Sequence, residues 1–148
     1  MKKYNAAFFG LFENTFKILQ KHYGKETALC LFQEIMETGL SKAYGFAIQP
    51  GDPDQFVRLV GERDKNVGLR VKFPKITEEE IIYQFHDDPF PNLKDQVAPQ
   101  ELDATYMNFK VKYLLGKNWD YKTTKHLWHG DKYIEHVIVK IQGKQSDQ

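Results

Sequence analysis

The sequence has little cysteine, no excess of one charge and no long apolar run, and each shortage excludes a class of protein. Of the 148 residues only Cys30 is a cysteine, which excludes an internal disulfide and a cysteine-based zinc motif. The 21 basic and 20 acidic residues are spread along the chain, so neither a nucleic acid nor an anionic membrane is indicated as a partner. No apolar run approaches the ~20 residues of a membrane span. We therefore expect a cytoplasmic protein whose partner is a small molecule.

The sequence also lacks any motif that names a reaction. It contains no glycine-rich phosphate loop, no Gly-x-Ser-x-Gly and no His-Glu-x-x-His, so the cofactor, if there is one, stays unknown. What it does contain is 41% hydrophobic and 14% aromatic residues, which is enough to bury a core. We expect a single domain over residues 1–141 and a polar tail at 142–148.

Apolar residues recur at helical spacing in the first half of the chain. The spacing predicts a helix over residues 4–23 that ends at Gly24, and a second helix over 25–40 that packs against it. Asp52 and Pro53 fit the N-cap and the first position of a third, shorter helix.

Beyond the third helix the period changes to two. Residues 67–73 and 81–86 alternate apolar and polar side chains, as half-buried strands do. This alternation places Ile81, Tyr83 and Phe85 on one face of the second strand. The two segments are therefore predicted to form antiparallel strands.

Residues 99–115 fit the period of a helix and also that of a strand. Pro99 at the start and Gly116 at the end favour the helix. The sequence as a whole predicts an α+β fold, in which the helices pack on one face of an antiparallel sheet that ends in a C-terminal β-hairpin.

The predicted hairpin covers residues 119–141. Its flanks are rich in β-branched and aromatic residues, and Gly130 with Asp131 suits a two-residue turn. In that register His126 lies opposite Glu135. Strand alternation places both on the face that we expect to be buried, where a histidine would offset the cost of a lone carboxylate.

Three histidines in this hairpin suggest a metal site, but strand geometry argues against it. His126 points to one face, whereas His129 and His136 point to the other face, which we expect to be half-solvated and lysine-rich. Metal ligands must converge on one point. No metal site is therefore predicted here.

The pair of His126 and Glu135 has a functional and a structural interpretation. A carboxylate that accepts from one imidazole nitrogen leaves the other nitrogen free to act as a general base. The alternative is a buried pair that only specifies the strand register. Asp103 or Tyr106, on the predicted fourth helix, would complete the site.

Other side chains are candidates for lining a ligand pocket. Trp128 and Tyr133 share the core-facing side of the hairpin, and His86 and Asp88 follow a predicted strand where they could rim a pocket or bind a cation. Turn chemistry explains the aspartate equally well. Cys30, between apolar neighbours, is predicted to be inert core.

The segment KYLLGKNWDYKTTKHLWHGDKYIEHVIVKI, residues 112–141, resembles the C-terminal signature of the 4-vinyl reductase domain and of L-2-amino-thiazoline-4-carboxylate hydrolase-like proteins. Gly130, Asp131 and Tyr133 are the most specific part of the match. The resemblance implies an α+β domain that holds a small, often apolar molecule between its helices and its sheet. Its enzyme version would hydrolyse a small heterocycle.

The chain departs from that signature at two positions. Two family cysteines would align with His126 and Ile134 of this chain, so thiol or metal chemistry at those positions does not carry over.

Three functional hypotheses follow from these residues. The first is a small-molecule-binding domain with an apolar pocket. The second is a hydrolase in which His126 is the general base, Glu135 orients it and Asp103 or Tyr106 completes the pocket. The third is a structural domain, or one that forms a homodimer, without a ligand.

Overall fold

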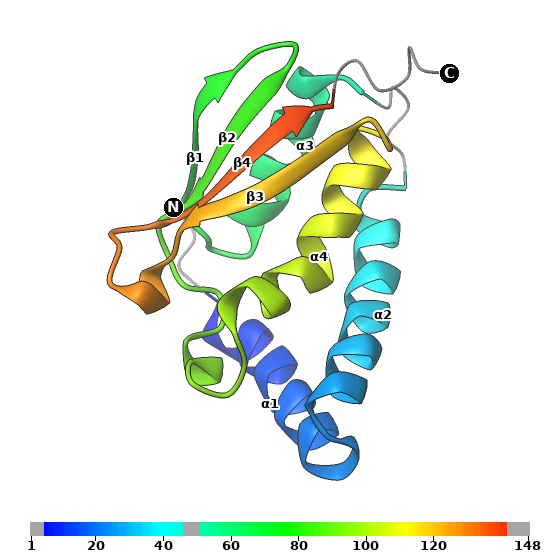
Figure 1. Cartoon of the computed structure of the whole chain (residues 1–148), viewed down its shortest axis with the longest axis vertical. Coiled ribbons are helices and arrows are strands. Elements are labelled where there is room, and N and C mark those ends of the chain that lie inside the picture. Colours follow the sequence, from blue (N-terminus) through cyan, green and yellow to red (C-terminus); the bar gives the residue numbers. More distant parts are fainter. Residues whose placement is uncertain (1–4, 46–50, 142–148) are drawn as a thin grey trace.

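The computed structural model describes residues 5–45 and 51–141 and confirms the predicted α+β fold (Figure 1). The expected polar tail at 142–148 lies outside the described residues. The elements are α1 (Ala6–Tyr23), α2 (Lys25–Ala43), α3 (Pro53–Asn66), β1 (Val71–Ile76), β2 (Glu80–Phe85), η1 (Pro91–Leu93), α4 (Pro99–Leu114), β3 (Trp119–Lys125), η2 (Leu127–His129) and β4 (Ile134–Lys140).

The helix ends follow the predicted local signals. Gly24, with φ of 86°, separates α1 from α2, a left-handed backbone value that glycine adopts without strain. The Asp52 side chain accepts from the first turn of α3, and Pro53 takes its first position. The ambiguous segment after Pro99 is a helix, as the terminal Pro and Gly favoured.

Four antiparallel strands form one sheet in the order β1-β2-β4-β3. The strand predicted at 67–73 is displaced, since α3 continues to Asn66 and β1 runs over Val71–Ile76. β1 includes Pro74, which lacks an N–H donor but is tolerated because β1 is an edge strand.

One face of the sheet is covered by helices. Ile81, Tyr83 and Phe85 are buried on this face of β2, as predicted. The Tyr83 hydroxyl contacts Asp64 of α3 and Lys110 of α4, so both helices lie on the same face. In Figure 1 the α1–α2 pair extends from this layer at the end away from the sheet.

The predicted register of the C-terminal hairpin is wrong. Glu135 pairs with Lys125, and not with His126, because the strands shift register between Thr123 and Lys125. The connection is also longer than two residues, since η2 precedes Gly130. Such a bulge places two residues opposite one and exchanges the faces of every later position.

The buried face of β4 is also the opposite of the predicted one, so a histidine that was expected to be half-solvated is buried. His136 is fully buried between Ile134 and Ile138, whereas Val139, expected in the core, is 40% exposed. His129 is exposed, as expected. The core-facing set of β4 is therefore the one that was expected to be half-solvated.

Candidate functional site

The helices and the sheet enclose a pocket that we call the helical pocket. It is lined from α1, α2, the end of α3, β2, the segment after β2 and α4. Its lining residues are Phe8, Phe9, Phe12, Ile35, Met36, Gly39, Leu40, Tyr44, Arg63, Asp64, Val67, Leu69, Phe85, Pro89, Phe90, Tyr106 and Lys110. The lining is aromatic and aliphatic except at one end, a composition typical of small-molecule sites.

The pocket is small. It offers about 80 Å³ to the centres of water-sized atoms, compared with the ~150 Å³ that holds benzene in an engineered apolar cavity. Part of its wall can adjust, because Phe8, Phe12 and Met36 are only half-buried and methionine is flexible. These dimensions favour a compact occupant of about one ring.

Its polar end is a buried cluster of Asp64, Tyr83 and Lys110. The Tyr83 hydroxyl donates to Asp64, and Lys110 Nζ lies 3.0 Å from that hydroxyl and 3.8 Å from Asp64 Oδ1. Lys110 also lies over three aromatic rings, with Nζ 5.1 Å from the centroid of Tyr106 and 5.2 Å from that of Tyr83. The third ring, that of Phe85, is 5.6 Å away.

Burial dominates the ionisation of this cluster. It raises the pKa of Asp64 above its usual range although Lys110 and the Tyr83 hydrogen bond oppose the rise. It lowers the pKa of Lys110, against the attraction of Asp64. Both shifts are in the direction of the neutral form, as expected where charges are removed from water, and the attraction between the two groups opposes them.

Two donors next to this cluster have no partner within the described part of the chain. They are the hydroxyl of Tyr44, which is 1% exposed, and Nε of Arg63. Burial raises the pKa of Tyr44, the charge of Asp64 raises it further, and that of Arg63 lowers it. Both residues line the pocket, and a buried donor without an acceptor requires an explanation.

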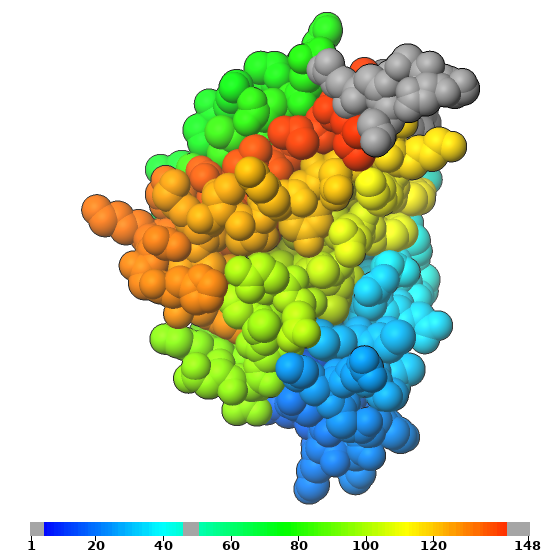
Figure 2. All heavy atoms as spheres, in the orientation of Figure 1, coloured from blue at the N-terminus to red at the C-terminus, as the bar shows by residue number. Residues whose placement is uncertain are grey.

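A second polar cluster, which we call the His126 network, joins the loop after β3 to α4. It links Asp88, Asp103, Tyr106, His126 and Trp128. His126 Nε2 lies 3.2 Å from Asp103 Oδ2, the Tyr106 hydroxyl donates to Asp103 Oδ1 at 3.0 Å, and the Trp128 indole donates to Asp88 at 2.6 Å. Figure 2 shows the orange loop against the segment that begins α4.

Both ring nitrogens of His126 are occupied. Nδ1 accepts from the Trp128 backbone N–H at 3.1 Å, so the proton of the neutral ring lies on Nε2, which donates to Asp103. His126 is 2% exposed. In this geometry neither nitrogen is free to accept a proton from a substrate.

The His126 network also fixes one wall of the helical pocket. Asp88 accepts from the backbone N–H of Phe90 at 2.9 Å as well as from Trp128, and Phe90 lines the pocket. On the other side of Phe90, Glu13 of α1 accepts from the backbone and the side chain of Asn92. The segment between is therefore held from both sides.

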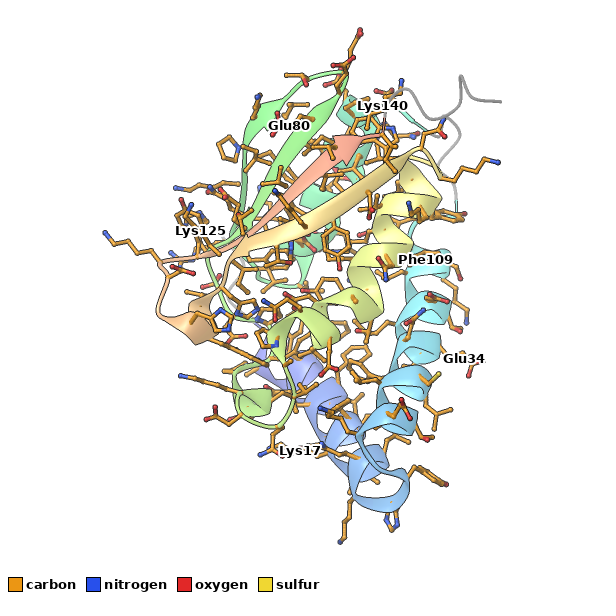
Figure 3. All side chains as sticks on the ribbon, viewed as in Figure 1. Lys17, Glu34, Glu80, Phe109, Lys125 and Lys140 are labelled. Carbon is orange, nitrogen blue, oxygen red and sulfur yellow. The ribbon has the colours of Figure 1, made fainter. Side chains whose placement is uncertain are left out.

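Glu135 belongs to a separate group around the sheet. It accepts from Thr124 at 2.6 Å and from Gln84 at 3.0 Å, and Lys125, labelled in Figure 3, lies 3.6 Å away. Burial alone would raise the pKa of Glu135, but these partners lower it. Its predicted pairing with His126 is not formed.

His86 and Tyr133 lie near the group around Glu135. His86 Nε2 is 3.1 Å from the Gln84 side chain, and its ring centroid is 5.0 Å from that of Tyr133. Neither residue lines the helical pocket. Of the five residues predicted to bind a ligand, Tyr106 is the one that lines the helical pocket.

Two other predictions can be compared with the structure. Cys30 is exposed, so its assignment to the core is wrong; it lies two residues from each of the buried Ala28 and Phe32, on the outer side of α2. Among the described residues no group of three His, Cys, Asp or Glu is placed to hold a metal ion.

The polar end of the pocket was missed by sequence reasoning, although spacing carries a signal for it. Lys110 follows Asp103 and Tyr106 at intervals of seven and four, so the three share one face of α4. Asp64 continues, at intervals of four, the buried stripe of Phe56 and Val60 on α3. A charged residue on an apolar stripe is the pattern that could have identified both.

No helix of residues 5–45 and 51–141 combines the length and the hydrophobicity that crossing a membrane requires. No protein-family model and no curated protein sequence matches the chain. Its fold is similar to a solved structure titled the phenol-responsive sensory domain of the transcription activator PoxR with phenol. The TM-score is 0.65 at 15% sequence identity, and the match covers 99% of this chain and 80% of the other. The chain therefore shares its fold with that sensory domain.

Proposed function

We propose that this chain is a small-molecule-binding domain that holds a single-ring, largely apolar ligand in the helical pocket. The observation that carries the proposal is the pocket itself, whose aromatic walls end in a few buried polar groups. The fold it shares with a sensory domain solved with phenol adds support.

We further propose that the domain is of the 4-vinyl reductase type. The support is the resemblance of residues 112–141 to that family's signature, together with a pocket between helices and sheet. The hydrolase and homodimer hypotheses stay predictions. The occupied nitrogens of His126 favour a positioning role for this residue over that of a general base.

Titration with phenol and with toluene, followed by amide chemical shifts in NMR, tests the proposal. We expect shifts concentrated on residues around the pocket, such as Met36, Leu40 and Phe90. Saturating ligand should also raise the free energy of unfolding, by about 2.7 kcal/mol at 100 times Kd.

A matched pair of glycine substitutions provides the control. Gly39 lines the pocket on α2, whereas Gly10 on α1 does not, and a Cβ at either position meets nothing within 4 Å. Gly39→Leu should fill the pocket and abolish binding, while Gly10→Leu should leave it intact. Equal binding by the two variants, or shifts confined to Trp128 and Tyr133, would contradict the proposal.

A further inference from the structure

We propose that the ligand of the helical pocket is a small single-ring carboxylate whose oxygens accept hydrogen bonds from Tyr44 and Arg63. The inference rests on the proposed function, because it names the chemical class of molecule that this pocket would select. It is derived from the polar end of the pocket.

The first observation is that both unpartnered groups are donors. An arginine guanidinium can only donate, and a neutral tyrosine hydroxyl donates one hydrogen. The hydroxyl of Tyr44 and Nε of Arg63 are buried without acceptors in the part of the chain that the structure describes. Leaving a buried donor without a hydrogen bond costs about 1–3 kcal/mol. A ligand that brings an acceptor oxygen to this end of the pocket would recover that free energy.

The second observation is an excess of one positive charge among the ionisable groups that line the pocket. Asp64 and Lys110 contribute no net charge together, whether the proton between them leaves an ion pair or two neutral groups. Arg63, half-buried with its guanidinium 5.7 Å from the Phe8 ring centroid, forms no ion pair within residues 5–45 and 51–141. An anion would therefore balance the charge of Arg63.

The third observation is the size and the apolar character of the remaining walls. Phe8, Phe9, Phe12 and Phe90 surround the rest of the pocket, and rings of this kind favour edge or stacked contacts with an aromatic ligand. The interior volume of about 80 Å³ favours a compact ligand over a long acyl chain. A carboxylate on a single ring satisfies the donors, the charge and the volume at once.

Calorimetric titration with four related probes tests the inference. Benzoate carries the acceptor and the charge, benzamide the acceptor alone, toluene neither, and benzylamine the opposite charge. We expect benzoate to bind most tightly, benzamide about 10-fold more weakly, since hydrogen bonds to charged groups are roughly twice as strong as neutral ones, and benzylamine not measurably.

Variants then assign the preference to its residues. Arg63→Gln should weaken benzoate binding by about 10- to 100-fold, the loss of a hydrogen bond to a charged group, and leave toluene binding unchanged. Arg58→Gln removes the same charge from an exposed position of the same helix and should change neither. Tyr44→Phe should weaken benzoate by about 10-fold and provides an independent test where Arg63→Gln does not fold.

The outcomes separate this inference from the proposed function. Binding of toluene in the pocket without a preference for benzoate over benzamide would overturn the carboxylate but retain the binding domain. Equal effects of Arg63→Gln and Arg58→Gln on benzoate would overturn it as well. Failure of all four probes to bind would overturn both proposals.

Discussion

The helical pocket and the His126 network lie on either side of Tyr106, and they differ in how their polar groups are satisfied. In the His126 network each of the two imidazole nitrogens, the Asp103 carboxylate and the Trp128 indole has a partner within the network. At the polar end of the pocket, the buried hydroxyl of Tyr44 and Nε of Arg63 have no hydrogen-bond partner in the described part of the chain. A satisfied network fixes a geometry, whereas buried donors without partners beside a cavity are available to a ligand that brings an acceptor. The difference therefore supports the proposal that the ligand binds in the pocket and that His126 has a positioning role.

The largest expected effect comes from breaking the cluster at the end of the pocket. Lys110→Met leaves Asp64 buried with only Tyr83 as a partner, and we expect a loss of about 3 kcal/mol in the free energy of unfolding, as for other broken buried ion pairs. Urea denaturation measures it. Adding Asp64→Asn should restore part of the loss, because no unpaired charge remains.

An exposed lysine provides the control for that variant. Lys122→Met, on the outer side of β3, should change stability by less than about 0.5 kcal/mol. A comparable loss in the two variants would contradict the account of the cluster.

His136 sharpens the comparison because it is buried and its Nε2 is unpartnered in the described chain, yet it lies outside the pocket. Burial lowers the pKa of His136 to about 4, against the opposing charge of Asp103. In the unfolded chain this histidine has its ordinary pKa of about 6.5. Between pH 6.5 and pH 4 the unfolded chain therefore binds more protons than the folded protein does. The contribution of His136 to the free energy of unfolding should be complete above pH 6.5 and should fall by about 3 kcal/mol as the pH is lowered to 4.

Unfolding measured across that pH window tests the role of this histidine. His136→Gln should flatten the dependence between pH 6.5 and 4, and His129→Gln, at an exposed position, should preserve it. A slope that persists in His136→Gln would mean that another group titrates.

A smaller effect is expected in the His126 network. His126→Gln removes the ring that joins Asp103 to the Trp128 backbone, so we expect a loss of about 1–2 kcal/mol in stability. Toluene affinity should fall only slightly, because His126 does not line the pocket and acts on it only through Trp128, Asp88 and Phe90. Abolished binding in a variant that folds would instead support a direct role of His126 at the ligand.

The smallest effect is expected at Cys30, which belongs to neither region. Because it is exposed, iodoacetamide should alkylate it in the folded protein as fast as in a short peptide. Cys30→Ser should change stability by less than about 0.5 kcal/mol. Protection from alkylation would restore the interpretation of this residue as core.

The fold was largely predictable because its signals are local. Helical periods, the cap at Asp52 and Pro53, and the terminal signals of Pro99 and Gly116 each act within a few residues. The alternation of Ile81 and its neighbours likewise identified the buried face of β2. Charged side chains on the outside of the helix pair, such as Lys17 and Glu34 in Figure 3, agree with the predicted amphipathic helices.

The hairpin was not predictable to the same degree, because its register depends on tertiary details. The His126 backbone donates to Asp131 at 2.8 Å, and His126 in turn accepts from Trp128, so the loop closes on itself one turn earlier than a Gly130–Asp131 hairpin would. That difference shifted the pairing of β3 with β4. The reversed faces of β4 are a separate error, in which the wrong side of this strand was expected to be buried. His126 was rightly placed in the core, but with the wrong carboxylate as its partner.

The polar end of the pocket was missed for another reason. Asp64 and Lys110 were not among the predicted site residues, since charged residues are rarely buried unless paired. Their pairing joins α3 to α4 across 46 positions of the chain, which no local pattern encodes. Tyr106, on a clear apolar stripe, was predicted and does line the pocket.

The most direct test of the central claim is a crystal structure of the chain soaked with toluene. We predict electron density for one ring in the helical pocket, between Phe12 of α1, Phe90 and Tyr106. Density beside His126 and Trp128, with the helical pocket unchanged, would contradict the claim.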